Sequence, residues 1–362
     1  MKIAIIHDWL VTDAGAEKVL KSIIEIYPDA DIYSLVDFLD EKDRKEILNN
    51  RYVNTSFIQN LPFAKNKFRN YLPLFPKAIQ SFDLSEYDLL ISSSWAVAKG
   101  VKKHTNQLHI SYCYTPIRYA WDLYDEYTSN LRQPKKFFVQ QTLKYIRKFD
   151  IDTLSSVDYF IADSHFVASR IKKTYNRESL VIYPPVDINN FKLNEKKEDF
   201  YITASRLVPY KKTKLIVEAF NEMPNKQLFV IGDGEDYSNI KSIAKDNIKL
   251  LGYQDKNTLI DYMQRAKAFV YAAIEDFGIL PIEAQACGTP VIALGVGGTK
   301  ETIKNKVSGI HFNKQTKEDI IKSVKEFETM DFNYRQISQD VDSFSTKRFK
   351  QELREFINSK IN

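Results

Sequence analysis

One stretch of the chain, residues 268–290, limits the possible folds more than any other. An apolar run from Ala268 to Ile274 is rich in aromatic and alanine residues and predicts a buried parallel strand. Two acids, Glu275 and Asp276, and a glycine follow this run, and Ile279 to Ala286 then predicts a short helix that ends at a glycine and a proline. This order places the acidic loop at the carboxyl edge of an open α/β sheet, where such sheets bind ligands.

The loop and the helix start together suit a phosphate-bearing ligand with hydroxyl groups. The first turn of a helix has unpaired backbone N–H groups and a positive dipole end, which favour an anion. Two carboxylates, Glu275 before the helix and Glu283 inside it, can accept hydrogen bonds from hydroxyl groups. We therefore expect ligand contacts at both acids and at the backbone of Phe277, Gly278, Ile279 and Leu280.

Strands and helices are predicted to alternate through both halves of the chain. This order indicates an α/β protein with two doubly wound, Rossmann-like parallel sheets. The length of 362 residues also exceeds one ordinary core. A polar, charged segment at 188–199 predicts the linker, which gives domains at 1–190 and 191–345 and a final helical segment at 346–362.

The composition excludes several classes of protein. A net charge of +5 is too small to indicate nucleic-acid binding. The two cysteines, Cys113 and Cys287, lie far apart and have no metal-ligand spacing, which favours a reducing compartment. No signal peptide and no apolar run of about 20 residues is found, so we expect a cytoplasmic protein.

No cofactor and no metal ion are expected. The chain has three Asp-x-Asp pairs. The pair at Asp29 precedes a predicted strand, the pair at Asp150 follows a predicted basic helix, and the pair at Asp340 lies in the C-terminal tail. None of the pairs is predicted at a strand end that faces the phosphate. Cationic side chains would replace a metal ion in this interpretation.

The segment EDFGILPIE, with ACGTPVIA and GGTKE after it, resembles the paired-glutamate motif of family 4 of the retaining glycosyltransferases, the group 1 glycosyltransferases. That family uses nucleotide sugars and has the GT-B fold. The resemblance implies two Rossmann-like domains that face each other across a cleft. It also implies that the helix at 346–362 crosses back to the N-terminal, acceptor-side domain.

The same resemblance assigns roles around the donor. The segment RLVPYK matches the family's pattern of an arginine followed by a lysine five residues later, so Arg206 and Lys211 are expected to hold the diphosphate. Lys212 is an alternative to Lys211. The resemblance implies that Glu275 holds the sugar hydroxyls and that Glu283 takes the ribose hydroxyls. Glu275, Arg206 and Lys211 are the predicted catalytic residues.

Further donor contacts are implied in three loops. Gly232 and Gly234 follow a predicted strand and would let the backbone approach the nucleotide, and Tyr253 is a candidate for packing against the base. Gly15, at the start of the first helix, would line the cleft. A plain turn is an equally good interpretation of Gly15.

The segment SYCYTPIRYAWD resembles a signature of O-antigen and capsule mannosyltransferase-like members. It suggests GDP-mannose as the donor and places Tyr114, Arg118, Trp121 and Asp122 on the acceptor or sugar side. The alternative is a small aromatic core. Many members have a histidine where this chain has Tyr114, and His109, earlier in a predicted strand, is expected to be a packed core residue.

Two segments combine basic and aromatic residues without acids. They are Lys65 to Lys77 and Asn130 to Phe149, and the second predicts a basic amphipathic helix. Both can rest on anionic lipid headgroups at a membrane surface. The alternative is a solvated helix face.

The function that these observations favour is sugar transfer with retention of configuration. A nucleoside-diphosphate sugar would be the donor, and a glycan or a lipid-linked molecule of surface polysaccharide biosynthesis would be the acceptor. Two alternatives remain: a non-catalytic, nucleotide-sugar-binding partner subunit, and a nucleotide-sugar epimerase on the same fold.

Overall fold

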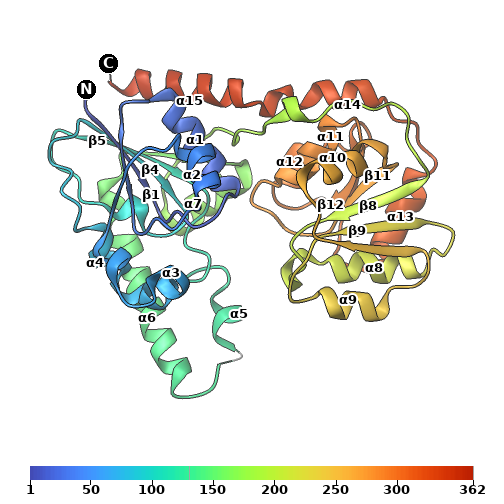
Figure 1. The fold of residues 1–362 in the computed structure, drawn as a ribbon, viewed down its shortest axis with the longest axis horizontal. Helices are drawn as coiled ribbons and strands as arrows, with labels where there is room; N and C mark the ends of the chain where they lie inside the picture. The colour runs from blue at the N-terminus through green and yellow to red at the C-terminus, as the bar shows by residue number, and fades with distance from the viewer. Residues whose placement is uncertain (130, 362) are drawn as a thin grey trace. The chain divides into compact units, whose positions relative to one another are not determined.

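The computed structural model describes residues 1–129 and 131–361, and the chain divides into two compact units. The first unit holds residues 1–185 and the chain end from Phe349, and the second holds residues 186–348. Each unit is built on one parallel sheet with helices packed on its faces (Figure 1). The prediction of two Rossmann-like parallel sheets is therefore confirmed.

The sheet of the first unit has seven parallel strands in the order β3-β2-β1-β4-β5-β6-β7. Their bounds are β1 Ile3–His7, β2 Asp31–Ser34, β3 Val53–Thr55, β4 Leu89–Ser94, β5 Leu108–Cys113, β6 Tyr159–Ala162 and β7 Ser179–Val181. The central strands β1, β4 and β5 are buried on both faces, as is typical of a parallel sheet that helices cover on both sides.

The helices of the first unit connect these strands. Its α-helices are α1 Gly15–Ile26, α2 Glu41–Leu48, α3 Ala64–Lys67, α4 Phe75–Ile79, α5 Tyr124–Ser129, α6 Lys135–Asp152 and α7 His165–Tyr175. Short 3₁₀ turns are η1 Phe57–Asn60, η2 Phe68–Leu74, η3 Ala98–Gly100 and η4 Leu154–Ser156. The predicted basic helix is α6, and Asn130, the first residue of that prediction, lies outside the described residues.

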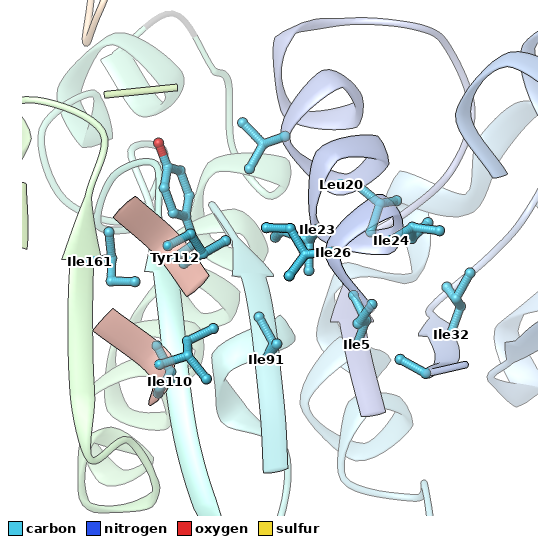
Figure 2. Close-up of a cluster of buried hydrophobic side chains, with 14 of the residues drawn as sticks. Ile5, Leu20, Ile23, Ile24, Ile26, Ile32, Ile91, Ile110, Tyr112 and Ile161 are labelled. Carbon is cyan, nitrogen blue, oxygen red and sulfur yellow. The ribbon is translucent and has the colours of Figure 1, made fainter. Parts of the chain in front are cut away.

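One face of this sheet packs against α1 in a cluster of branched aliphatic side chains. Figure 2 shows Ile5 and Ile91 of the strands beside Ile23 and Ile24 of α1, and Ile110 of β5 belongs to the same cluster. The last helix, α15 Thr346–Ile361, adds three further side chains to the same cluster, namely Phe349, Leu353 and Ile357. All three are fully buried, so the end of the chain is part of the first unit's core.

The sheet of the second unit has six parallel strands in the order β10-β9-β8-β11-β12-β13. Their bounds are β8 Phe200–Ala204, β9 Gln227–Ile231, β10 Ile248–Gly252, β11 Ala268–Tyr271, β12 Val291–Leu294 and β13 Gly309–Phe312. The strand order reverses direction at β8 and β11, which are neighbours. Such a switch point leaves a crevice at the carboxyl ends of the strands.

The helices of the second unit are α8 Thr213–Asn221, α9 Tyr237–Ile243, α10 Lys256–Arg265, α11 Ile279–Ala286, α12 Thr299–Thr302, α13 Lys317–Phe327 and α14 Tyr334–Asp340. Its 3₁₀ turns are η5 Ile188–Asn190, η6 Pro209–Lys211 and η7 Val341–Phe344. The predicted helix at 279–286 has the predicted bounds. The strand predicted at residues 268–274 is three residues shorter in the structure and ends at Tyr271. Beyond it, the Ala272 carbonyl accepts a hydrogen bond from the Gln315 side chain at 2.7 Å instead of pairing with a neighbouring strand.

Among the described residues, no helix has both the length and the apolarity that a membrane crossing needs, and this includes the two longest, α6 and α15.

Candidate functional site

The candidate site lies at the carboxyl edge of the second unit's sheet. β11 pairs with β8 on one side and with β12 on the other, so the loops after these three strands meet at one edge. The loop after β8 carries Arg206 and Lys211, and the loop after β11 carries Glu275. The switch point thus brings together residues that are far apart in the sequence.

Three side chains form the centre of the site. The Lys211 ammonium group forms an ion pair with Glu275 Oε1, and the Tyr271 hydroxyl donates to the same oxygen at 2.9 Å. Lys211 Nζ also lies 3.4 Å from the Tyr271 hydroxyl oxygen. The side chains of Lys211 and Glu275 are 17% and 20% exposed, so the pair is partly shielded and still open to a ligand.

Tyr271 acts in this cluster as a neutral hydrogen-bond donor. Its side chain is 3% exposed, and this burial raises the pKa of the phenol well above its usual value near 10. The negative charge of Glu275 raises the pKa further. Tyr271 therefore holds one oxygen of Glu275 and leaves the second oxygen for another partner.

The loop of Glu275 rests on a pair of glycines from the loop after β12. The Gly298 N–H donates to the Glu275 carbonyl at 2.9 Å, and Gly297 forms a bridge with Glu275. A Cβ atom at Gly298 would lie 2.2 Å from the Phe277 carbonyl oxygen, which no real Cβ atom tolerates. Glycine is thus required here by the close contact of two backbones.

Helix α11 begins directly after this loop without a side-chain cap. The N-cap residue is Gly278, which has a φ of 91° and no side chain that could cap the helix. Ile279 and Leu280 are half-buried, while Phe277 is buried and packs against Phe344 at 5.7 Å between ring centroids. The N–H groups at the start of α11 are therefore suited to an anion.

Glu283 lies one turn inside α11, and its side chain is 7% exposed. It is not part of the cluster around Lys211. Gln285, two residues further along, lies on another face of the helix, and its amide donates to the Pro281 carbonyl at 3.2 Å and to the Thr302 carbonyl at 3.1 Å. These contacts hold α11 against the end of α12.

The two lysines of the loop after β8 have different surroundings. Lys211 faces Glu275, whereas Lys212 is exposed and has a left-handed backbone with a φ of 58°. Lys212 lines an open hollow of about 430 Å³ together with Asp236, Asn239 and Gln315. The geometry thus selects Lys211 over Lys212 as the lysine beside the acid.

Arg206 follows β8 and is exposed. Within residues 1–129 and 131–361 its guanidinium group has no hydrogen-bond or ion-pair partner, so its five donors are available to a ligand.

The glycines after β9 support this arginine-bearing loop. Gly232 and Gly234 have φ values of 133° and 152°, and Cβ atoms there would lie 1.9 Å from the Ser205 carbonyl oxygen and 2.4 Å from that of Leu207. The close contact with the loop after β8 therefore explains why both positions need glycine, and no ligand contact is required for this explanation. The Gly232 N–H also donates to the Gly252 carbonyl at 2.8 Å, which places the next residue, Tyr253, beside this turn with 79% of its surface exposed.

The predicted residues of the first unit form a separate set at the carboxyl edge of its own sheet. Gly15 is the first residue of α1. The Tyr114 hydroxyl, after β5, donates to the Ala16 carbonyl at 3.0 Å and lies 2.8 Å from Ser93 Oγ. Burial raises the pKa of Tyr114 well above its usual value near 10, so this group is a neutral donor.

This hydrogen-bond chain leads to two residues that the sequence did not single out, His7 and Glu17. Because the Tyr114 hydrogen goes to a carbonyl, Ser93 donates to Tyr114 and accepts from His7 Nδ1, which lies 2.9 Å away. His7 Nε2 then faces Glu17 Oε1 at 3.6 Å, and both side chains are buried. No local pattern marks the pair, because one residue ends β1 and the other lies in the first turn of α1.

Trp121 and Asp122 are held by other parts of the first unit. The Trp121 indole N–H donates to Asp150 Oδ2 at 2.7 Å, and Asp122 forms an ion pair with Arg170. Trp121 also packs on a small apolar cluster that contains Ile117, Ala120 and Ile146. Arg118 is half-buried on the same segment. These contacts agree with the packing alternative for Trp121 and Asp122.

Asp150 itself belongs to a buried polar group. Its carboxylate pairs with Lys99 at 2.7 Å and accepts from the Tyr175 hydroxyl at 2.9 and 3.0 Å. Because each carboxylate oxygen of Asp150 has a hydrogen-bond donor, this group is a structural anchor between α6, α7 and the segment of Trp121.

Among the residues that the structure describes, no group of three or more His, Cys, Asp or Glu side chains is placed to hold a metal ion.

The fold and the edge-loop site define a class of protein, the two-sheet α/β proteins of the GT-B type. Residues 186–341 match the family described as "Glycosyl transferases group 1". The chain is 18% identical, with a TM-score of 0.70, to the solved Anabaena protein HepE in complex with UDP and glucose, and the match covers 99% of this chain and 100% of that one.

Two curated relatives match over a shorter range. An uncharacterized glycosyltransferase of Methanocaldococcus jannaschii is 25% identical over 195 residues, which cover 52% of this chain and 55% of the relative. A GDP-mannose-dependent monoacylated alpha-(1-6)-phosphatidylinositol monomannoside mannosyltransferase of Corynebacterium glutamicum is 29% identical over 180 residues, which cover 41% of this chain and 47% of the relative. The chain thus spans about half the length of the curated relatives that it matches.

Proposed function

We propose that this protein is a glycosyltransferase that moves a sugar from a nucleoside diphosphate to an acceptor hydroxyl with retention of configuration. The bond between the anomeric carbon and the diphosphate oxygen breaks, and the acceptor oxygen forms a new bond to the same face of that carbon. The acceptor's proton passes to the departing diphosphate, which leaves as the nucleoside diphosphate. The protein's main contribution would be stabilisation of the negative charge that grows on this leaving group.

The observation that carries the proposal is the cluster of Lys211, Tyr271 and Glu275 at the switch point of a segment that matches the group 1 family. An ammonium group has three donors, and two of them are directed at Glu275 and Tyr271. The third remains for a phosphate oxygen. Arg206, exposed at the end of β8, would supply a bidentate contact to the same diphosphate.

The remaining roles follow from position. The uncapped start of α11, from Phe277 to Leu280, would bind the diphosphate, and Glu275 would orient the sugar through its hydroxyl groups. Glu283 would take the ribose hydroxyls, and Tyr253 would pack against the base. The reaction is proposed to proceed without a metal ion or a cofactor, because cationic side chains and helix N–H groups would supply the positive charge.

GDP-mannose is the first candidate for the donor. The SYCYTPIRYAWD segment resembles mannosyltransferase-like sequences, and one curated relative is named as GDP-mannose-dependent. UDP-glucose is the second candidate, because HepE was solved with UDP and glucose. The acceptor is proposed to be a glycan or lipid-linked intermediate of a surface polysaccharide, reached at the inner face of the plasma membrane.

The proposal is tested by thermal shift with a panel of nucleotide sugars, followed by an assay for free sugar released from any donor that binds. We expect one donor to raise the Tm by several degrees at saturation, because it binds only the native state. Slow release of sugar should accompany this binding and should disappear in Glu275→Gln. Binding without release or transfer would identify a sugar-nucleotide-binding module, and a panel with no shift at all would overturn the site.

A further inference from the structure

Helix α6 has an unusual distribution of apolar side chains. Its inward face carries Leu143, Ile146, Phe149 and Asp150, all of which are buried. The opposite face also carries large apolar groups, because Phe137, Phe138 and Tyr145 are 53%, 65% and 46% exposed, respectively. An ordinary surface helix has charged and polar groups on its outer face.

The exposed groups follow the helical repeat. Phe137, Gln141, Lys144, Tyr145 and Lys148 are spaced at i, i+4, i+7, i+8 and i+11, so they lie on one face, and all of them are exposed. Aromatic rings and lysines therefore alternate along one outer stripe of the helix. Figure 1 shows that α6 extends away from the sheet of its own unit, which leaves this stripe uncovered by that sheet.

A second segment of the same unit has the same character. Residues 61–77 contact α6 through η2, where Leu72 packs against the cluster of Ile146. This segment exposes 78% of Phe63, together with four basic side chains, namely Lys65, Lys67, Arg69 and Lys77. We call residues 61–77 and 131–148 together the aromatic–basic face.

The charge of this face is one-sided. The two segments contain ten Lys and Arg residues and no Asp or Glu. The whole chain has 52 basic and 47 acidic side chains, so the rest of the chain has 42 and 47 and is net acidic. The positive charge of the protein is therefore concentrated where the exposed aromatic rings are.

We propose that the aromatic–basic face docks on an anionic lipid bilayer. Phe137, Phe138 and Phe63 would enter the region between headgroups and acyl chains, and the lysines would contact anionic headgroups. Charge complementarity favours a lipid surface over a neutral partner, and two kinds of contact together give stable binding where one alone is weak. The inference is independent of the proposed enzyme activity, because it rests on residues outside the second unit.

The docking helix also holds the predicted acceptor segment. The Arg147 guanidinium group donates to the Ala120 carbonyl, and Asp150 holds the Trp121 indole. The exposed face of α6 thus carries the docking residues, while Arg147 and Asp150, on its inner side, position residues 120–121. Docking would bring this segment close to the membrane surface, where a lipid-linked acceptor lies.

The test is sedimentation of the full chain with vesicles of phosphatidylcholine alone and with vesicles that also contain phosphatidylglycerol. We expect binding to the anionic vesicles only and a strong loss of binding at high salt. The double variant Phe137→Ser, Phe138→Ser should weaken binding about tenfold or more, with an unchanged circular dichroism spectrum and Tm. Lys144→Glu should weaken it to a similar extent.

Two matched controls separate docking from general effects. Tyr52→Ser removes another highly exposed ring of the first unit, and Lys322→Glu with Lys325→Glu changes exposed charges on α13 of the second unit. Both should sediment like the wild type. Three results would each overturn the proposal: equal binding to both kinds of vesicle, no binding to either kind, or unaltered binding of the phenylalanine variant. The absence of binding to either kind of vesicle would point to a protein as the partner of this face.

Discussion

Lys211 and Glu275 form an ion pair although 64 residues separate them in the sequence. The pair exists because β8 and β11 are neighbours and end at the same edge of the sheet. Tyr271, on the last position of β11, fixes one carboxylate oxygen of Glu275 at 2.9 Å. The acid therefore has a defined orientation before any ligand binds, which is what a positioning group requires.

We expect Glu275→Gln to remove sugar transfer while the fold remains. The amide keeps the size of the side chain and can still accept from Tyr271, but it loses the charge that pairs with Lys211. Transfer should fall by about a hundredfold or more, as for other preorganised electrostatic groups. The change in unfolding free energy should stay within about 1 kcal/mol, since the pair is partly exposed. Asp246→Asn, at an exposed position of the same unit, should leave transfer unchanged.

Arg206→Ala is expected to weaken binding of the donor. A charge-assisted hydrogen bond contributes about 1.5–3 kcal/mol, so the Kd of the nucleotide sugar should rise by about 10- to 100-fold. Titration of the variant with the donor by calorimetry measures this. Lys241→Ala removes another exposed cation, on α9, and should bind like the wild type. Equal affinity of Arg206→Ala and wild type would remove the arginine from the site.

The sequence predicted the local order of this site and not its long-range contacts. The strand, acidic loop and helix of residues 268–290 follow from apolar runs and breakers within about 20 neighbouring positions. The choice between Lys211 and Lys212 does not follow from such patterns. It depends on the tertiary structure, in which Lys211 pairs with Glu275 and Lys212 is exposed.

The segment around Trp121 shows why function could not be separated from packing on the sequence alone. The high density of aromatic residues in this segment is visible in the sequence, but the partners of its polar groups are not. Trp121 donates to Asp150 and Asp122 pairs with Arg170, and both partners lie on later helices. Only the tertiary structure reveals that these side chains are already satisfied. His109, by contrast, was expected to be a core residue, and the structure buries it completely.

Gly298→Ala should disturb the loop of Glu275. The added methyl group would lie 2.2 Å from the Phe277 carbonyl oxygen and 2.3 Å from its Cα, so two backbones must separate. We expect a loss of about 3 kcal/mol or more in unfolding free energy and a weaker thermal response to the donor. Gly295→Ala, three residues earlier, meets only the His311 side chain at 3.1 Å and should cost less than about 1 kcal/mol. Urea denaturation of the two variants compares them, and equal losses would contradict the role of the close contact.

His109 makes the stability of the protein depend on pH. Burial lowers the pKa of its imidazole from 6.5 to about 4, although its contact with the Ser156 carbonyl opposes this shift. Between pH 6.5 and pH 4 the unfolded chain therefore binds a proton that the folded protein does not bind, so stability is full above pH 6.5 and falls as the pH decreases toward 4. The loss of unfolding free energy from this one group is up to about 3 kcal/mol.

The side chain of His109→Gln stays neutral throughout, so the stability of this variant should fall less between pH 7 and pH 5 than that of the wild type. The stability of His104→Gln, changed at an exposed position, should fall as much as that of the wild type. Chemical denaturation at the two pH values measures both differences, and an equal decrease in all three proteins would show that His109 does not govern the acid sensitivity.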